Sequence, residues 1–414
     1  RWGVCALVLG FASFILQPVS AASVLYVKPS ALGSGDCSAW AHACTLQTAL
    51  TNAVNGNEIW VMEGVYKPGT ARTATFQLRT GVSVYGGFAG TETSRDERDP
   101  AANAVILSGD IGVVGTRSDN VYHVVTGVDG ALLDGVTITA GNANGVSPND
   151  TGGGMINNGA SPTLNDVIFS NNSASFRGGG MFNNNSSPTL TDVIFTGNAS
   201  TSYDGGGMYN YAGSPSLTDV VFIDNDAEFD GGGMYNWLGS PILTSVTFDS
   251  NVANNGDGGG IYNYDCDASP SLANVIFTSN VAFGLGGGMH NDSCAPTLTD
   301  VTFDDNFAYK WAGGMHNLDS DPTLEDVNFS HNRAMESGGG MFNDYSNPIL
   351  VNVTFSENSA ITINGGGMLN TNSSPSLTNV TFHDNSADDN GGGMYNNASI
   401  PTIENAIFWA NTAN

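Results

Sequence analysis

Apolar and polar residues alternate in short runs along residues 151–414, and these runs recur with a period of about 26 residues. Nearly every unit contains Gly-Gly-Gly-Met-x-Asn, a proline five residues later, then Leu-x-x-Val-x-Phe and Phe-x-x-Asn. The first string is centred on Met155, Met181, Met208, Met234, Ile261, Met289, Met315, Met341, Met368 and Met394. Short alternating runs bounded by Gly, Pro, Asn and Asp predict strands and turns, and a fixed period predicts a solenoid.

Each unit is expected to form one coil of three short strands and three corners. Leu, Val and Phe of the Leu-x-x-Val-x-Phe string share a face only if the chain bends between Leu and Val. The bending residue is Asp or Asn in nine units and Ser245 in the other, and Asx residues tolerate the left-handed conformation that such a corner needs. Coils stacked ~4.8 Å apart would align Met, Leu, Val and Phe in four interior ladders, and the recurring asparagines in amide ladders. The sequence therefore predicts an all-β, right-handed parallel β-helix with ten regular coils, numbered here from the unit of Met155.

The residues before this array predict an export signal and an irregular cap. Residues 1–22 combine Arg1, an apolar run and Ser20-Ala21-Ala22, which is typical of a secretory signal peptide. Residues 23–150 are expected to cap the solenoid, with a short amphipathic helix at 45–53 plugging its open end. Strand-like runs lie at 24–27, 58–66, 75–88, 104–107 and 121–125, and a half-repeat lies at 131–142. Residues 151–414 form the regular coils, which we expect to be truncated at the C-terminus.

Charge narrows the classes of partner. The chain has 39 acidic and 11 basic residues, a net charge of −28. Residues 151–414 contain 27 of the acidic residues but only Arg177, Lys310 and Arg333 among the basic ones. Such a surface repels phosphate backbones, so nucleic acid is not an expected partner. No stretch after the signal is apolar enough to cross a bilayer, and the mature protein is expected outside the cell or at its outer surface.

The paired Gly-Gly-x-Met and Phe-x-x-Asn strings resemble the repeats of chlamydial-type polymorphic outer membrane proteins. The stretch from Asn57 to Pro68, followed by 84–88 and 107–110, is similar to the N-terminal region of bacterial exported proteins with pectin-lyase-like β-helices. These resemblances imply an envelope or secreted protein, for which adhesion is a frequent role.

Coils 3 to 5 carry the strongest candidate for a binding site. The residue after each Met position and the residue two further on are both expected to face outward, which would make a platform of two aromatic rows. An aspartate precedes each glycine triplet in the same coils. The platform and its acids comprise Tyr209, Tyr211, Tyr235, Trp237, Tyr262, Tyr264, Asp204, Asp230 and Asp257. Aromatic faces beside carboxylates suit sugar rings, whereas the alternative is a set of cross-strand pairs that only stabilises the sheet.

Two further sites are weighed against simpler interpretations. The stacked aspartates would bind Ca²⁺, or else splay into solvent. His290 and His316 take the tyrosine position in coils 6 and 7 with Asp292 nearby, so they form either a transition-metal site or two more members of the aromatic ladder. No cofactor is otherwise predicted.

The repeat register predicts the cysteine pairing of the mature chain. Cys266 and Cys294 each lie five residues after the Met position of adjacent coils, with Cα atoms expected ~5 Å apart, inside the range of a disulfide. Cys37 and Cys44 would then pair locally before the capping helix. The alternative is four free thiols in a reducing compartment.

The function predicted from these features is a non-catalytic secreted or surface β-helix that contacts polysaccharides or cell-surface glycans. A polysaccharide lyase would need a basic residue beside an acidic cluster, and the coils hold only three basic residues. The strings typical of polygalacturonases are largely missing. A carbohydrate-active enzyme and a structural spacer are therefore kept as alternatives.

Overall fold

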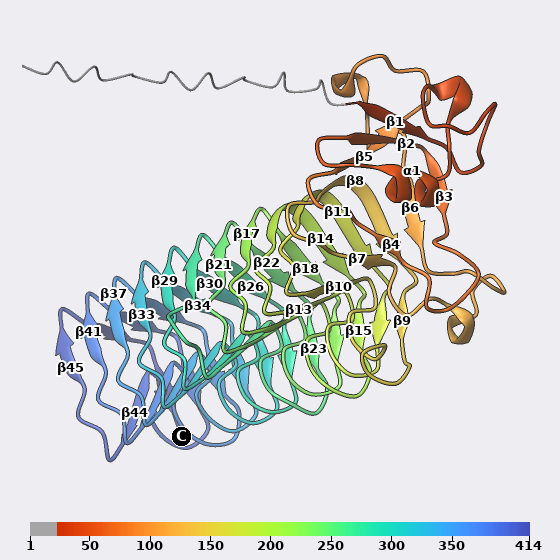
Figure 1. Cartoon of the computed structure of the whole chain (residues 1–414). Coiled ribbons are helices and arrows are strands. Elements are labelled where there is room, and N and C mark those ends of the chain that lie inside the picture. The colour runs from red at the N-terminus through yellow and green to blue at the C-terminus, as the bar shows by residue number, and fades with distance from the viewer. Residues whose placement is uncertain (1–22) are drawn as a thin grey trace, which may run out of the picture.

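The chain winds into a rod of stacked coils with an irregular cap at its N-terminal end (Figure 1). The structure is a computed structural model that describes residues 23–414, so the predicted signal peptide at 1–22 lies outside the described residues. The rod is a right-handed parallel β-helix of about 14 turns. Its strands pair in parallel, coil upon coil, in sheets of 24, 12 and 11 strands.

The 12-stranded sheet carries the Gly-Gly-Gly-Met-x-Asn strings. Its strands are β4 (Phe76–Gln77), β7 (Val125–Thr126), β10 (Met155–Asn158), β13 (Met181–Asn184), β16 (Met208–Tyr211), β20 (Met234–Trp237), β24 (Ile261–Tyr264), β28 (Met289–Asp292), β32 (Met315–Leu318), β36 (Met341–Asp344), β40 (Met368–Thr371) and β44 (Met394–Asn397).

The 24-stranded sheet carries the Leu-x-x-Val-x-Phe strings. In the cap and the first two regular coils it comprises β1 (Val24–Val27), β2 (Glu58–Met62), β3 (Gly64–Tyr66), β5 (Ser83–Phe88), β6 (Val105–Ser108), β8 (Leu132–Thr139), β11 (Thr163–Ser170) and β14 (Thr189–Thr196). From coil 3 onward the string divides into two strands. The first strands of these pairs are β17 (Ser216–Thr218), β21 (Ile242–Thr244), β25 (Ser271–Ala273), β29 (Thr297–Thr299), β33 (Thr323–Glu325), β37 (Ile349–Val351), β41 (Ser376–Thr378) and β45 (Thr402–Glu404). The second strands are β18 (Val221–Ile223), β22 (Thr247–Asp249), β26 (Ile276–Thr278), β30 (Thr302–Asp304), β34 (Asn328–Ser330), β38 (Thr354–Ser356), β42 (Thr381–His383) and β46 (Ile407–Trp409).

The 11-stranded sheet is a part of the coil that the sequence analysis missed. It consists of two-residue strands just after the Phe-x-x-Asn strings, so most coils contain four strands in three sheets and not three strands. The strands are β9 (Asn142–Ala143), β12 (Ser173–Ala174), β15 (Ala199–Ser200), β19 (Asp226–Ala227), β23 (Val252–Ala253), β27 (Val281–Ala282), β31 (Phe307–Ala308), β35 (Arg333–Ala334), β39 (Ser359–Ala360), β43 (Ser386–Ala387) and β47 (Thr412–Ala413). Two residues are too few to show an alternating pattern, so periodicity could not predict these strands.

The predicted interior is confirmed. Met, Leu, Val and Phe of successive coils form one continuous buried core. The phenyl rings of the Phe column stack nearly parallel, with centroids 4.7 to 5.0 Å apart. The bend between Leu and Val is made by residues with φ between 48° and 56°, and Ser245 adopts the same conformation as the Asx residues, with φ 55°. Asx side chains therefore suit this corner for the expected conformational reason.

Both predicted asparagine columns form continuous amide ladders. In the 12-stranded sheet each Nδ2 donates to the Oδ1 of the next coil, as Asn210 does to Asn236 at 2.6 Å. In the second column, Asn225 Nδ2 donates to Asn251 Oδ1 and also to the carbonyl oxygen of Phe195. The buried amides are thereby paired along the length of the rod.

The cap contains the expected helix. Thr45 caps α1 (Leu46–Asn52) by accepting a hydrogen bond from the Thr48 amide, and the apolar face of the helix packs on the solenoid core. Three 3₁₀ helices accompany it, η1 (Trp40–His42), η2 (Arg95–Glu97) and η3 (Arg117–Asp119). Of the run predicted at 121–125, only Val125 lies in a strand, because the preceding residues cross between sheets.

Candidate functional site

Three neighbouring strands of the 12-stranded sheet carry the aromatic residues singled out by the sequence. β16, β20 and β24 pair in register, so equivalent residues lie side by side on adjacent coils. Alternation along each strand turns Met and Asn into the core and the aromatic residues to the outer face of the sheet. The inner row comprises Tyr209, Tyr235 and Tyr262, and the outer row comprises Tyr211, Trp237 and Tyr264.

The inner row is buried, so the expectation that both rows form an exposed platform is wrong. Its three rings are only 0, 7 and 8% exposed and stack face to face, with centroids 4.9 and 5.0 Å apart. The corner that precedes the strand lies against this row. Gly205, with φ 68°, packs so tightly that an added Cβ would lie 2.9 Å from the Cβ of Tyr209. Ring faces that cover one another cannot receive a ligand, and the inner row therefore supports the site from below.

The outer row reaches the surface. Tyr211, Trp237 and Tyr264 are half-buried, and they pack on the inner row. The rings of Tyr211 and Trp237 meet edge to face at 5.1 Å, and Trp237 and Tyr264 are tilted by 50° at 6.0 Å. Because these rings do not stack in parallel, parts of their faces remain open to a ligand.

A third row, which the sequence analysis missed, lies on the loops before the glycine triplets. This loop row comprises Phe176, Tyr203 and Phe229 of coils 2 to 4. Tyr203 and Phe229 are 44 and 43% exposed, and neighbouring rings lie 4.4 and 6.1 Å apart. Each aromatic residue stands two positions before the glycine triplet, a recurrence that would have predicted the row.

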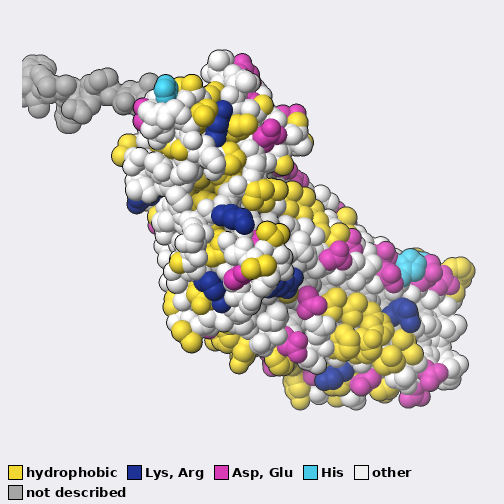
Figure 2. Space-filling model, turned by 90° about the vertical axis from the view of Figure 1, so that its right-hand side faces the viewer, with side chains coloured by type: hydrophobic (Ala, Val, Ile, Leu, Met, Phe, Trp, Pro, Cys, Tyr) yellow, Lys and Arg dark blue, Asp and Glu magenta, His cyan; other side chains and the backbone are white. Residues whose placement is uncertain are grey.

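Arg177 connects the loop row to the outer row. Its guanidinium carbon lies 4.4 Å from the ring centroid of Phe176, 4.8 Å from that of Tyr209 and 5.7 Å from that of Trp237. Phe176 of the loop row and Trp237 of the outer row thus lie beside one guanidinium that also covers the buried ring of Tyr209, and we call the loop row and the outer row together the aromatic face. Figure 2 shows hydrophobic side chains gathered in one area of the rod, with Lys or Arg side chains at its margins.

The three aspartates of the site hold the loops together. Asp204 Oδ1 accepts a hydrogen bond from the Asp230 amide, Asp230 Oδ1 accepts one from the Asp257 amide, and Asp257 Oδ1 accepts one from the Leu285 amide. Burial raises the pKa of all three carboxyls, that of Asp230 to about 7. They do not splay into solvent as considered from the sequence. In residues 23–414 no group of three His, Cys, Asp or Glu side chains is arranged to hold a metal ion.

His290 and His316 continue the inner row and are fully buried. His290 stacks on Tyr262, with ring centroids 4.6 Å apart. The Nδ1 atoms of His290 and His316 lie 3.2 Å apart, so one imidazole donates a hydrogen bond to the other. Burial lowers the pKa of His290 to about 3, and burial together with His290 lowers the pKa of His316 well below its ordinary value. Asp292 does not join the pair, because it lies in the position of the outer row and accepts a hydrogen bond from Ser293.

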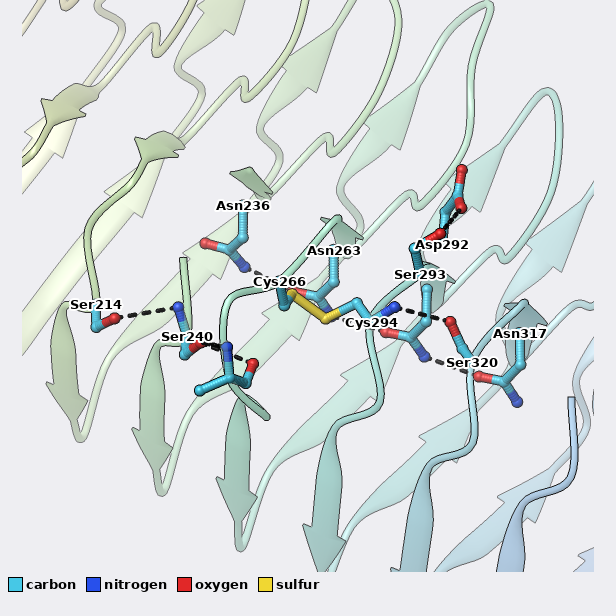
Figure 3. The surroundings of a disulfide bond; sticks show 12 residues. Ser214, Asn236, Ser240, Asn263, Cys266, Asp292, Ser293, Cys294, Asn317 and Ser320 are labelled. Atoms are coloured by element: carbon cyan, nitrogen blue, oxygen red, sulfur yellow. Dashed lines mark hydrogen bonds between the residues drawn. A yellow bond between two sulfur atoms is a disulfide. The ribbon is translucent and has the colours of Figure 1, made fainter. Parts of the chain in front are cut away.

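The structure joins Cys266 to Cys294 and Cys37 to Cys44, with Cα atoms 4.9 and 4.7 Å apart. Figure 3 shows the first bond bridging two adjacent coils beside the asparagine ladder. In later coils the equivalent position is a serine whose hydroxyl accepts a hydrogen bond from the backbone of the preceding coil, as Ser320 does from Cys294. The disulfide thus occupies a position at which other coils are linked by a serine hydrogen bond.

Peptide mapping of the protein without reduction is expected to yield a Cys266–Cys294 pair and a Cys37–Cys44 pair. The shared register brings the first two together, and an oxidising compartment lets the bonds persist. The double variant Cys266→Ser and Cys294→Ser is a matched control, because serine is the ordinary residue of the column. A peptide linking Cys37 or Cys44 to either of the other cysteines would contradict the register of the coils.

Among the clefts outside the aromatic face, one of about 220 Å³ lies between residues 100–105 and the outer side of the 24-stranded sheet, and Val136 and Asp166 line it. Nearby Asp134 forms an ion pair with Arg98 at 2.6 Å. Burial is the main factor that raises the pKa of Asp166.

Residues 245–264 match the model of the Chlamydia polymorphic membrane protein repeat. No curated protein sequence matches the chain significantly. Among the described residues, no helix is long and apolar enough to span a membrane.

Several solved structures resemble this one at low sequence identity. Pectate lyase Pel9A is 15% identical over 80% of this chain and 79% of its own, with a TM-score of 0.46. PfbA, a surface adhesin of Streptococcus pneumoniae, is 10% identical over 94% of this chain and 91% of its own, with a TM-score of 0.37. The polygalacturonase of Erwinia carotovora ssp. carotovora is 11% identical over 97% of both chains, with a TM-score of 0.34.

Proposed function

We propose that this pectin-lyase-like β-helix, with its polymorphic-membrane-protein-type repeat, is an exported surface or secreted protein that contacts glycans without catalysing a reaction on them. The observation that carries the proposal is the aromatic face, where partly exposed rings from four adjacent coils border one surface. Isolated exposed aromatic residues need no explanation, whereas a contiguous set favours an interaction site.

Aromatic rings suit carbohydrate because a sugar ring has an apolar C–H face and a polar rim. The C–H face packs on the ring and loses contact with water, while tyrosine hydroxyls and the indole N–H meet the sugar hydroxyls. Trp237 is central to the outer row and presents the largest ring, and it also faces the guanidinium of Arg177. We therefore expect it to supply the main contact.

The triple variant Tyr211→Ala, Trp237→Ala and Tyr264→Ala is expected to lose retention on polysaccharide, while its far-UV circular dichroism stays unchanged. The outer row lies outside the solenoid core, so its removal leaves the ladders of the interior intact. Affinity electrophoresis in gels containing polysaccharide measures the retention. The control is Tyr235→Phe, which preserves the buried stack and should bind as the wild type does.

Undiminished retention of the triple variant would exclude the aromatic face as the binding site. An assay for unsaturated products and new reducing ends, run on the same polysaccharides, addresses the alternative of a carbohydrate-active enzyme, for which the cleft at Asp166 is the place to look. Absence of both binding and turnover would favour the structural spacer.

A further inference from the structure

We propose that the aromatic face takes an uncharged, linear polysaccharide that lies along the rod axis across coils 2 to 5. This inference rests on the proposed function and adds the chemical class of the ligand and its direction. Geometry determines the direction, and charge determines the class.

The direction follows from the spacing of the rings. Each coil contributes one ring to a row, and successive rings of the outer row lie 5.1 and 6.0 Å apart along the stacking direction. The loop row runs parallel to it, with rings 4.4 and 6.1 Å apart. A polysaccharide laid along the axis would place about one sugar residue on each successive aromatic ring. A polysaccharide laid across the coils would contact only the rings of one coil. Only the axial arrangement uses the whole face.

The class follows from the charges near the rings. Asp204, Asp230 and Asp257 lie in the loops before the glycine triplets of coils 3 to 5 and are held there by hydrogen bonds from the following coil. Burial raises the pKa of each carboxyl, so all three carry their full charge only in mildly alkaline solution. The Nε of Arg177 lies 3.7 Å from Asp204 Oδ2, and Lys310 lies near enough to Asp257 to favour its ionised form, so both cations already face a carboxylate.

Above the raised pKa values of these carboxyls, an anionic polysaccharide would therefore approach a surface whose nearby cations are already matched by aspartates. Repulsion acts on every acidic sugar of the chain and slows its association. A neutral polysaccharide escapes this penalty, because its hydroxyls form hydrogen bonds with tyrosine hydroxyls without adding charge. The surface thus disfavours negatively charged polysaccharides, while the packing of sugar C–H faces on the aromatic rings is the same for charged and neutral ones.

The test uses pairs of polysaccharides that share a backbone and differ in charge at C6. The protein is run by affinity electrophoresis at pH 8.5, above the pKa of Asp230, against two such pairs, methyl-esterified and de-esterified homogalacturonan, and 1,4-linked mannan and polymannuronate. We expect retention on a neutral member to exceed that on its acidic partner roughly tenfold at low salt. The ratio should fall as salt screens the field. Equal or stronger retention on the acidic members would overturn the inference and leave the proposed function standing, whereas no retention on any of the four would overturn both.

Two further measurements test the causes separately. The double variant Asp230→Asn and Asp257→Asn keeps both hydrogen-bond acceptors, and at pH 8.5, above the pKa of Asp230, it removes two charges and should narrow the neutral-over-acidic ratio. An unchanged ratio would show that these carboxylates do not set the class. For the direction, affinity for neutral oligosaccharides should rise with each added sugar up to about one per coil of the face. A plateau at the disaccharide would contradict an axial ligand.

Discussion

Replacing Asn236 with leucine is expected to lower the free energy of unfolding, although leucine adds apolar surface to the interior. Asn236 is fully buried, its Oδ1 accepts from Asn210 at 2.6 Å, and its Nδ2 donates to Asn263 at 2.8 Å. Leucine would leave an amide hydrogen of Asn210 and the Oδ1 of Asn263 without partners in the core. Each such group costs about 1–3 kcal/mol, so the expected loss is ~2–6 kcal/mol. The urea midpoint measures it.

The same sheet offers a control for this substitution. Asn158 of β10 is exposed, and its Oδ1 accepts a hydrogen bond from Asn184 Nδ2 where water can replace the lost partner. Asn158→Leu should therefore shift the midpoint far less than Asn236→Leu. A midpoint for Asn236→Leu equal to or above that of the wild type would mean that hydrogen bonding in this column contributes nothing net to stability.

The repeat made the interior predictable because one register determines many contacts at once. Once Met181 and Met208 are placed at equivalent positions, the alignment of their Leu, Phe and Asn neighbours follows, and the structure has these pairs. The bend was predictable for a local reason, since a left-handed conformation favours Asp and Asn. The pairing of Cys266 with Cys294 in the structure depends on the same register.

The candidate site was harder to predict because the loops that cover it do not follow the repeat. Alternation correctly assigned Tyr209 to the outer side of the sheet, but it carries no information about what packs on that side. Arg177 lies over Tyr209 from a loop whose length and sequence differ between coils. The aspartates were misjudged for a similar reason. A carboxylate that accepts an amide hydrogen from the next coil looks the same in sequence as one that points into water.

Below pH 6.5 the wild-type protein is expected to lose stability relative to the double variant His290→Tyr and His316→Phe. Tyrosine and phenylalanine are the residues of the same column in the adjoining coils, Tyr262 and Phe342, so the variant preserves the stack. The two histidines are neutral when folded, because burial lowers both pKa values and the proximity of His290 lowers that of His316 further. In the unfolded chain they take up protons near pH 6.5.

The sign of the effect follows from this difference in proton binding. A group whose pKa falls on folding contributes its full stability above the unfolded pKa and loses it as pH decreases towards the folded pKa, here from 6.5 to about 3 for His290. Within that window each histidine that stays neutral removes about 1.4 kcal/mol per pH unit, an order-of-magnitude slope. The buried aspartates have raised pKa values and act in the opposite sense, and both proteins contain them. Asp257 Oδ2 lies 4.0 Å from His290 Nδ1, so the difference between the two proteins reports the histidine pair together with its effect on this one carboxyl.

Urea unfolding of both proteins at pH 7.5, 6.0 and 5.0 measures this difference. The wild-type value should fall increasingly below that of the variant at the two lower pH values. As a control, His331→Gln removes an exposed histidine whose pKa is raised, chiefly by its hydrogen bond with Asp304, and it should not reproduce the acid dependence. Parallel curves for the wild type and the double variant would show that the pair is hydrated or already protonated in the folded rod. If the unfolding free energies of the two proteins instead diverge from about pH 6.5 downward, the histidines are the residues of the inner row that make the stack sensitive to acid.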